Sequence, residues 1–260
     1  MEYTTILVSD QGPVRRITLN RPGRHNALTH VLQTELIAAL EESVSSACRV
    51  VVLHGAGKSF CAGLDLDELQ TSANSDGNEA KARAELLARM FRTLHDLLKP
   101  TIAAVKGAAI AGGTGLAMVC DYTLATPDAK FGFTEVRIGF VPALVSAYLA
   151  LQVGDKQARG LLLSGRFFGA AEAYRLGLVH EVVEQGQLTS RVNELAEALA
   201  RNSPQSLAAT KRLLSSQNKA WLDSALTLAI EANAEARETE DFREGIAAFL
   251  EKRSPVWMKG

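Results

Sequence analysis

The sequence predicts an α/β fold followed by a helical C-terminal region. Three observations lead to this prediction. Short apolar strand-like runs alternate with amphipathic helical segments up to about residue 186. Two turns that lead from a strand through glycines into a helix recur about fifty residues apart, near residues 63 and 112. From residue 187 onward, every periodic segment has helical spacing. We therefore expect a core over residues 1–186 and a helical region over residues 187–260.

Composition narrows the class of protein. The chain has 260 residues, 47% apolar side chains and a formal net charge of −1. No basic run interleaved with aromatic residues occurs, so nucleic acid and anionic membranes are poor candidate partners. No apolar run reaches the roughly 18 residues that span a bilayer, and the N-terminus lacks a signal-peptide pattern. The three cysteines have no metal-like spacing, which favours reduced thiols and a cytoplasmic location.

The N-terminal elements follow from turn and cap residues. Strand-like runs at residues 4–8 and 14–19 flank a Gln11-Gly12-Pro13 turn, as in a hairpin. A loop then leads to Thr29, which is suited to cap a helix whose apolar residues recur every three or four positions. Residues 50–53 form a short run of β-branched and aliphatic side chains, which predicts a buried strand.

The remaining elements are bounded by glycine and proline. A helix over residues 80–98 ends before Pro100, and strands are expected at 101–105 and 121–125. Gly154 and Gly165 interrupt the helical spacing that follows, because glycine commonly ends a helix. The expected later elements are helices at 143–151, 155–163 and 170–176, a strand at 179–183, and helices at 188–201, 204–215, 219–238 and 241–250.

The two glycine-rich turns are the strongest functional signal. The segment from Lys106 to Asp121 holds four glycines within nine residues and runs into an apolar helix. Residues 58–69 contain a second such turn at Gly63 and Leu64, just before a helix that starts with acidic residues. Each turn exposes backbone N–H groups at the positive end of a helix. Close packing of helix on strand would explain one such turn, but two that converge would form an oxyanion hole.

Glu135 is the candidate proton-transfer group. It stands alone in the apolar and aromatic segment 131–142, where burial would raise its pKa. An ion pair with Arg137 or another cation is the alternative reading. Signatures of a Ser-His-Asp triad, a P-loop and a dinucleotide fingerprint are missing from the sequence. With these three classes of site excluded, the residues favour enolate chemistry on a thioester or ketone. Arg24 and His25 could hold a phosphate.

Five segments carry a family resemblance in the expected order: NRPGRHNAL (20–28), KSFCAGLDLDEL (58–69), VKGAAIAGGTGLAMVCD (105–121), FGFTEVRIGFVP (131–142) and FLEKRSPVWMKG (249–260). With these segments the chain resembles the enoyl-CoA hydratase/isomerase (crotonase) superfamily over nearly its whole length. The resemblance implies a spiral of repeated ββα units, with the helical C-terminal region forming homotrimers that often pair into homohexamers. It also implies a lyase of fatty acid metabolism that needs no metal and no cofactor apart from the coenzyme A of its acyl-CoA substrate.

By position, the resemblance assigns the oxyanion amides to Leu64 and Gly112 and the catalytic acid to Glu135. The loop Ala62-Gly63-Leu64-Asp65 should lie along the acyl-CoA. Arg24 and His25 should lie near the phosphates or adenine of coenzyme A. Lys252 and Trp257 stand where family members reach coenzyme A, sometimes across a subunit interface.

The sequence also departs from the family pattern. Two-glutamate hydratases have their first glutamate where this chain has Gly115, and dienoyl-CoA isomerases have an aspartate where it has Ala143. A single acid leaves three hypotheses open. The first is a hydratase similar to those acting on branched, methylglutaconyl-type thioesters, in which Arg137 could meet a distal carboxylate. The second is a Δ3,Δ2-enoyl-CoA isomerase with one carboxylate as proton shuttle. The third is a non-catalytic acyl-CoA-binding scaffold.

Overall fold

The structure is a computed structural model that describes residues 2–72 and 77–258. In these ranges the strands are β1 (Ile6–Gln11), β2 (Val14–Leu19), β3 (Val50–Gly55), β4 (Thr101–Val105), β5 (Ala108–Ile110), β6 (Tyr122–Ala125), β7 (Lys130–Gly132), β8 (Phe167–Gly169) and β9 (Glu181–Val182). The helices are α1 (His30–Ser45), α2 (Leu66–Ser72), α3 (Gly77–Asp96), α4 (Gly112–Val119), α5 (Ala143–Ser164), α6 (Ala170–Arg175), α7 (Leu188–Arg201), α8 (Pro204–Ala236) and α9 (Glu240–Leu250). Three short 3₁₀ turns are η1 (Pro22–Arg24), η2 (Glu135–Ile138) and η3 (Val256–Met258).

The main sheet has six strands in the order β1-β2-β3-β4-β6-β9. β1 and β2 form the expected antiparallel hairpin, and every later neighbour pair is parallel. Parallel neighbours need a crossover connection, and the intervening helices supply it. The α/β class predicted from the sequence is therefore confirmed.

A second, smaller layer explains the recurring ββα pattern. β5, β7 and β8 form a three-stranded sheet, in which β5 and β7 are parallel. Twice in succession the chain makes a strand of the main sheet, a short strand of the small sheet and then a helix: β4-β5-α4 and β6-β7-α5. Isolated parallel bridges, Leu28 to Leu64 and Cys61 to Ala109, extend this second layer into the N-terminal part of the chain. They bring the two glycine-rich turns side by side.

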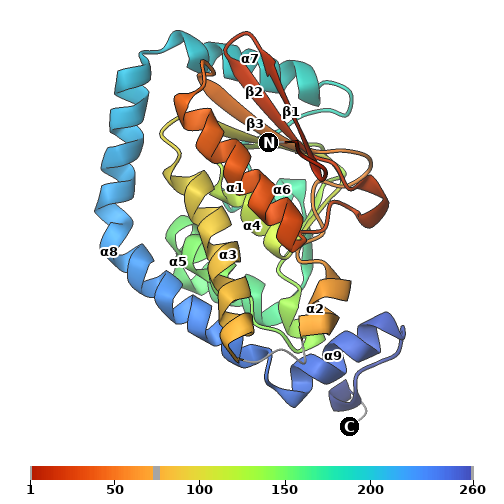
Figure 1. Ribbon diagram of the computed structural model, residues 1–260. Helices are drawn as coiled ribbons and strands as arrows, with labels where there is room; N and C mark the ends of the chain where they lie inside the picture. The colour runs from red at the N-terminus through yellow and green to blue at the C-terminus, as the bar shows by residue number, and fades with distance from the viewer. Residues whose placement is uncertain (1, 73–76, 259–260) are drawn as a thin grey trace.

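The core lies on both faces of the main sheet, because alternate side chains of a strand point to opposite faces. On β3, Val51 and Leu53 join the large cluster beneath α1, α3, α4 and α5, whereas Val50 and Val52 face a second cluster. Helix α7 covers that second cluster with Val192 and Ala196. Figure 1 shows α1 and α3 side by side on one face of the molecule and α7 beside the first strands.

The helical C-terminal region is dominated by α8, a single helix of 33 residues. The predicted break between residues 215 and 219 is wrong. The polar residues there stay helical because they point outward: the Ser216 hydroxyl donates to the Arg212 carbonyl (2.7 Å), and Lys219 pairs with Asp223 one turn later. Figure 1 shows α8 running along one side of the molecule towards α9 and the C-terminus.

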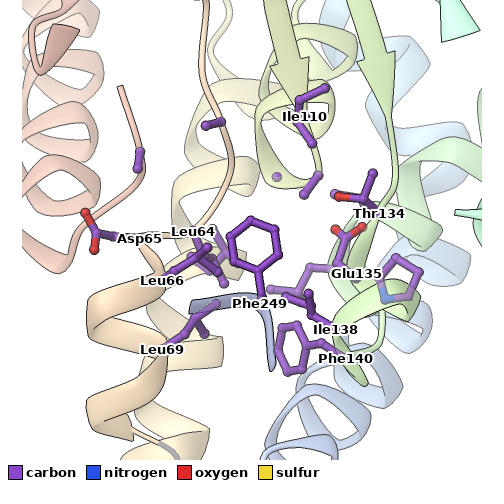
Figure 2. Close-up of a pocket in the computed structure, with 18 of the residues that line it drawn as sticks. Leu64, Asp65, Leu66, Leu69, Ile110, Thr134, Glu135, Ile138, Phe140 and Phe249 are labelled. Atoms are coloured by element: carbon purple, nitrogen blue, oxygen red, sulfur yellow. The ribbon is translucent and has the colours of Figure 1, made fainter. Parts of the chain in front are cut away.

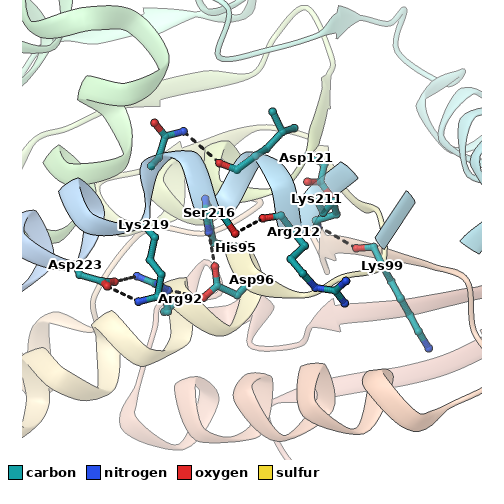
Figure 3. A network of polar contacts seen from close by, with 12 residues as sticks. Arg92, His95, Asp96, Lys99, Asp121, Lys211, Arg212, Ser216, Lys219 and Asp223 are labelled. Atoms are coloured by element: carbon teal, nitrogen blue, oxygen red, sulfur yellow. Dashed lines mark hydrogen bonds and ion pairs between the residues drawn. The ribbon is translucent and has the colours of Figure 1, made fainter. Parts of the chain in front are cut away.

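Ion pairs fix α8 to the α/β core (Figure 3). Lys211 Nζ donates to Asp121 Oδ2 (2.6 Å) and to the Lys99 carbonyl (3.1 Å). Arg92 of α3 donates to Asp223 Oδ1 of α8 (2.7 Å). Helices α3 and α8 therefore pack as one unit, which matters because both supply walls of the cavity described below. The division of the chain at residue 187 stays a prediction.

Other boundaries moved by a few residues. α3 begins at Gly77 rather than at residue 80 and ends at Asp96 rather than at 98. The predicted break between two helices at Gly154 is confirmed, because the backbone of α5 is not helical at that residue (φ 75°, ψ 159°). None of the helices in the described ranges is both long enough and apolar enough to cross a membrane.

Candidate active site

A cavity of about 520 Å³ opens between the two glycine-rich turns, η2 and the helices α3, α8 and α9. Most of its walls are aliphatic or aromatic. Figure 2 shows Leu64 and Glu135 on opposite sides of it, with Phe249 of α9 between them in this view. A mostly apolar cavity with a few polar groups is the usual form of a small-molecule site. The cavity contains residues of both turns and the predicted acid.

The first turn places Leu64 at the cavity. Leu28 N donates to the Gly63 carbonyl (2.8 Å), and Asp65 N donates to the Leu28 carbonyl (3.2 Å). These bonds use the groups on either side of Leu64. The Leu64 N–H itself has no acceptor among the residues that the structure describes. A backbone donor without a partner beside a cavity is available to a ligand.

The second turn does the same for Gly112. Ala111 has φ 52° and ψ −123°, a conformation that costs a residue with a side chain about 1–3 kcal/mol. The hydrogen bond from Ala111 N to the Gly132 carbonyl (2.6 Å) holds it there. Gly112 is the first residue of α4, so its N–H has no partner within the helix. In residues 2–72 and 77–258 it has no other acceptor either.

The two turns are packed against each other. A Cβ added to Gly63 would lie 2.9 Å from the Ala111 Cβ and 3.3 Å from Gly112 N. Gly63 also has φ 86°, which favours glycine. A Cβ added to Gly113 would lie 2.1 Å from the Cys61 carbonyl oxygen. Only glycines allow this approach. Leu64 and Gly112 both line the cavity, and the N–H of each has no acceptor in the part of the chain that the structure describes.

Glu135 begins η2 on the other side of the cavity. Its side chain is 8% exposed, and Oε2 has no hydrogen-bond partner in the part of the chain that the structure describes. Burial raises the pKa of Glu135 to about 7, and a hydrogen bond from its own backbone N–H opposes the shift only in part. A carboxyl group with this pKa can both accept and return a proton near neutral pH.

The alternative reading, an ion pair of Glu135 with Arg137, is wrong. The Arg137 guanidinium lies over the Phe167 ring, 5.0 Å from its centroid. Across the described residues, no Lys, Arg or His nitrogen lies within ion-pair distance of Glu135. The carboxyl group is therefore held by packing rather than by a counter-charge, which is why its pKa rises.

The position of the missing second acid is filled. A Cβ on Gly115 would lie 2.5 Å from Val145 Cγ1 and 3.1 Å from Phe91 Cζ. Both side chains line the cavity. A glutamate at position 115 would therefore require these two residues to move, so the loss of that acid is built into the packing of α3 and α5 against α4.

Charged residues surround the outer part of the cavity. Arg24 and His25 line it, and His25 Nδ1 lies 3.1 Å from the Ser59 hydroxyl. Arg24 pairs with Asp67 of α2, and both side chains are more than half exposed. Ala62 also lines the cavity. These residues are where the sequence predicted contacts with coenzyme A.

Two other predicted binding residues have different surroundings. Asp65 is 4% exposed and accepts hydrogen bonds from Arg21 Nη1 (2.9 Å) and from the Asp67 N–H (3.2 Å), so its carboxylate anchors the turn and the start of α2. Lys252 is exposed just after α9 and does not line this cavity. Trp257 is 40% exposed.

Sequence reasoning missed several residues of the site. Phe249 and Asn233 line the cavity although they lie in the C-terminal helices. One signal for Asn233 exists in the sequence: it follows Leu222, Leu226 and Ala229 at helical spacing and so interrupts an apolar stripe with an amide. Phe249 has no such signal, because an exposed aromatic residue at the end of a helix is ordinary.

Comparisons with known proteins relate nearly the whole chain to one family. A family model described as enoyl-CoA hydratase/isomerase matches residues 9–260. A relative from Thermus thermophilus, provisionally named an enoyl-CoA hydratase, is 43% identical and covers 95% of this chain and 98% of its own. The short-chain-enoyl-CoA hydratase of Clostridium acetobutylicum is 34% identical and covers 97% of both chains. A crystal structure of an enoyl-CoA hydratase from Mycobacterium avium superposes with a TM-score of 0.88 at 36% identity, covering 98% of this chain and 100% of its own.

Proposed function

The chain belongs to the enoyl-CoA hydratase/isomerase family, and we propose that it adds water across the 2,3 double bond of an enoyl-CoA thioester. The observation that carries the proposal is the buried Glu135 carboxyl group, whose Oε2 has no partner in the described chain, in one cavity with the N–H groups of Leu64 and Gly112. In this proposal the thioester oxygen accepts one hydrogen bond from each of these two N–H groups. The acyl chain then extends past Glu135.

The proposed reaction needs one acid. The Glu135 carboxylate accepts a proton from a water molecule as the water oxygen bonds to C3. The electron pair of the double bond moves to the thioester, and the enolate oxygen is stabilised by Leu64 N–H and Gly112 N–H. Glu135 then returns the proton to C2, so the product carries both hydrogens of the water. The carboxyl pKa of about 7 suits both steps. No redox change occurs, so the proposed reaction needs no redox cofactor, and coenzyme A takes part as a portion of the substrate.

Substitution of Glu135 by glutamine tests this role. Glu135→Gln keeps the shape of the side chain but cannot accept the proton, so we expect kcat for hydration to fall about 10²–10⁴-fold. Loss of the ultraviolet absorbance of the conjugated thioester measures hydration of crotonyl-CoA and of 3-methylglutaconyl-CoA. A variant that retains full kcat on both substrates would contradict the proposal.

An isomerase is the second candidate, and the filled space at Gly115 favours it. Because Val145 and Phe91 leave no room for a second acid, one carboxylate must serve any reaction. A proton moved by Glu135 between C2 and C4 would convert a 3-enoyl into a 2-enoyl thioester. Incubation of 3-hexenoyl-CoA separates the two reactions. A rise in ultraviolet absorbance without a mass gain of 18 Da would identify the isomerase, whereas a hydratase alone would leave this unconjugated chain unchanged and would hydrate 2-hexenoyl-CoA.

We also propose that the acyl group is branched or of the glutaconyl type. The aliphatic and aromatic lining of the cavity suits a methyl branch near the double bond. Arg137, which the sequence offered as a partner for a distal carboxylate, lies over Phe167 and does not line the cavity. A distal polar group would therefore have to meet another residue.

A homotrimer or homohexamer is part of the proposal. Leu214, Trp221 and Leu228 recur every seven residues on α8 and are 55%, 47% and 67% exposed. Side chains at this spacing share one face of a helix, and an exposed apolar stripe of this kind favours an interface. Sedimentation of Trp221→Glu beside the unmodified protein tests it: a smaller particle supports the proposal, and an unchanged trimer places the interface elsewhere.

A further inference from the structure

The cavity contains one buried polar side chain whose role the proposed reaction leaves unexplained. Among the described lining residues, three polar side chains are less than a tenth exposed: Asp65, Glu135 and Asn233. Asp65 is engaged by Arg21, and Glu135 is the proposed acid. Asn233 on α8 is 3% exposed and lies on a wall formed otherwise by apolar residues. A buried amide in such a wall is costly unless its hydrogen-bonding groups are used.

Arg237 determines which way the Asn233 amide faces. Arg237 Nε donates to Asn233 Oδ1 (3.4 Å) one helical turn away, and the pair is buried. A guanidinium group has donors only, so the amide oxygen must be the atom that faces Arg237. The guanidinium is itself held over the Phe140 ring, 5.3 Å from its centroid. The Asn233 NH₂ group is therefore the end of the amide left for the cavity.

The position of Asn233 assigns this NH₂ group to the acyl chain. The proposed reacting carbons lie between the Leu64 and Gly112 amides and Glu135, and coenzyme A is expected near Arg24 and His25. The remaining cavity, with walls from α2, α3, α8 and α9, receives the rest of the acyl chain. Asn233 is the buried hydrogen-bond donor that α8 contributes to that part.

Resting on the proposed function, we propose that Asn233 is a specificity residue that binds a hydrogen-bond-accepting oxygen on the acyl chain beyond the reacting double bond. The substrate class is then a 2-enoyl-CoA whose acyl chain ends in a carboxylate or a hydroxyl group. Arg237 acts as a positioning residue, because it orients the amide without facing the substrate. A site built around a hydrogen bond rejects the analogue that lacks the partner group, since a buried donor is then left unpaired.

Two variants test this inference against a purely structural role of Asn233. Asn233→Asp keeps the shape and the acceptor for Arg237 but removes the NH₂ donor. Asn233→Leu removes both. The substrates are 2-enoyl-CoAs of five to seven carbons in matched sets, with chains ending in a methyl, a hydroxyl or a carboxylate group. The readout is the ratio of kcat/KM between oxygen-ended and methyl-ended chains.

We expect the unmodified protein to favour an oxygen-ended chain and both variants to lose that preference by about 10- to 100-fold. The carboxylate and hydroxyl arms identify which oxygen is bound. If the ratio of kcat/KM between oxygen-ended and methyl-ended chains were the same in the unmodified protein and in Asn233→Asp, the inference about Asn233 would be overturned. Hydration of the methyl-ended chains would still support the proposed function in that case. Absence of hydration of every chain would instead overturn the proposed function. Thermal unfolding of Asn233→Asp confirms that the variant is folded.

Discussion

The unpaired burial of Glu135 predicts how stability depends on pH. The carboxyl pKa is about 7 in the folded chain and about 4.5 when the side chain is exposed. Between these values the folded state holds more protons than the unfolded state, so the free energy of unfolding falls as pH rises from about 4.5 to 7. The difference of roughly 2.5 pKa units corresponds to about 3 kcal/mol. The amide of Glu135→Gln cannot titrate, so this contribution to the fall in the free energy of unfolding is missing from the variant.

Urea unfolding at pH values from 4 to 8 measures the effect in both proteins. We expect the free energy of unfolding of Glu135→Gln, minus that of the unmodified protein, to rise by about 3 kcal/mol across this range and to level off at either end. Glu197→Gln is the matched control, because Glu197 is exposed on α7; its difference should stay flat. A flat difference for Glu135→Gln would refute the reasoning, since it would mean that a hidden partner or water stabilises the charged carboxylate.

Three further predictions test the rest of the site. Gly63→Ala should lower kcat about 10²-fold in the hydration assay, because a Cβ at φ 86° and 2.9 Å from Ala111 displaces the Leu64 N–H; an unchanged kcat would show that this N–H is not used. Gly115→Ala should reduce the free energy of unfolding by about 1–3 kcal/mol in urea, and Val145→Ala should restore part of it in the double variant. An unchanged free energy of unfolding of Gly115→Ala would mean that α5 can shift to make room for the methyl group at no cost in stability. Arg24→Gln should raise KM severalfold and Asp67→Asn should lower KM, with kcat unchanged in both, because Asp67 competes with substrate phosphates for Arg24. Equal KM values in the unmodified protein and both variants would show that Arg24 does not bind the substrate.

The local signals of the sequence predicted the elements that carry their own caps and turns. Thr29 caps α1 as expected, accepting from the Leu32 N–H (3.2 Å). α7 has the predicted bounds because its apolar spacing is strong and Asn202-Ser203-Pro204 ends it. The strands of the small sheet were harder to predict, since β5, β7 and β8 have three residues each and two parts of that layer are single bridges. A strand of three residues is too short to show the alternation of apolar and polar side chains that identifies a strand in a sequence. It forms because of contacts with residues distant in the chain.

The site shows the same division between local and long-range information. Glycine spacing pointed to Gly63 and Gly112, and an isolated acid in an apolar segment pointed to Glu135. The strained backbone of Ala111 had no signal, because alanine seldom adopts φ 52° and the hydrogen bond from Ala111 N goes to Gly132, on a strand later in the chain. The polar role of Asp65 was also hidden, since its partner Arg21 is 44 residues away. Asn233 joins the cavity because α8 packs on the core through Leu222, Leu226 and Ala229 and pairs with α3.

A structure with a bound, unreactive saturated thioester such as butyryl-CoA tests the central claim most directly. The account predicts that the thioester oxygen lies about 2.7–3.1 Å from both Leu64 N and Gly112 N. It also predicts that the Glu135 carboxyl group faces C2 and C3 of the acyl chain. A thioester oxygen that meets neither nitrogen, or a Glu135 side chain turned away from those carbons, would contradict it.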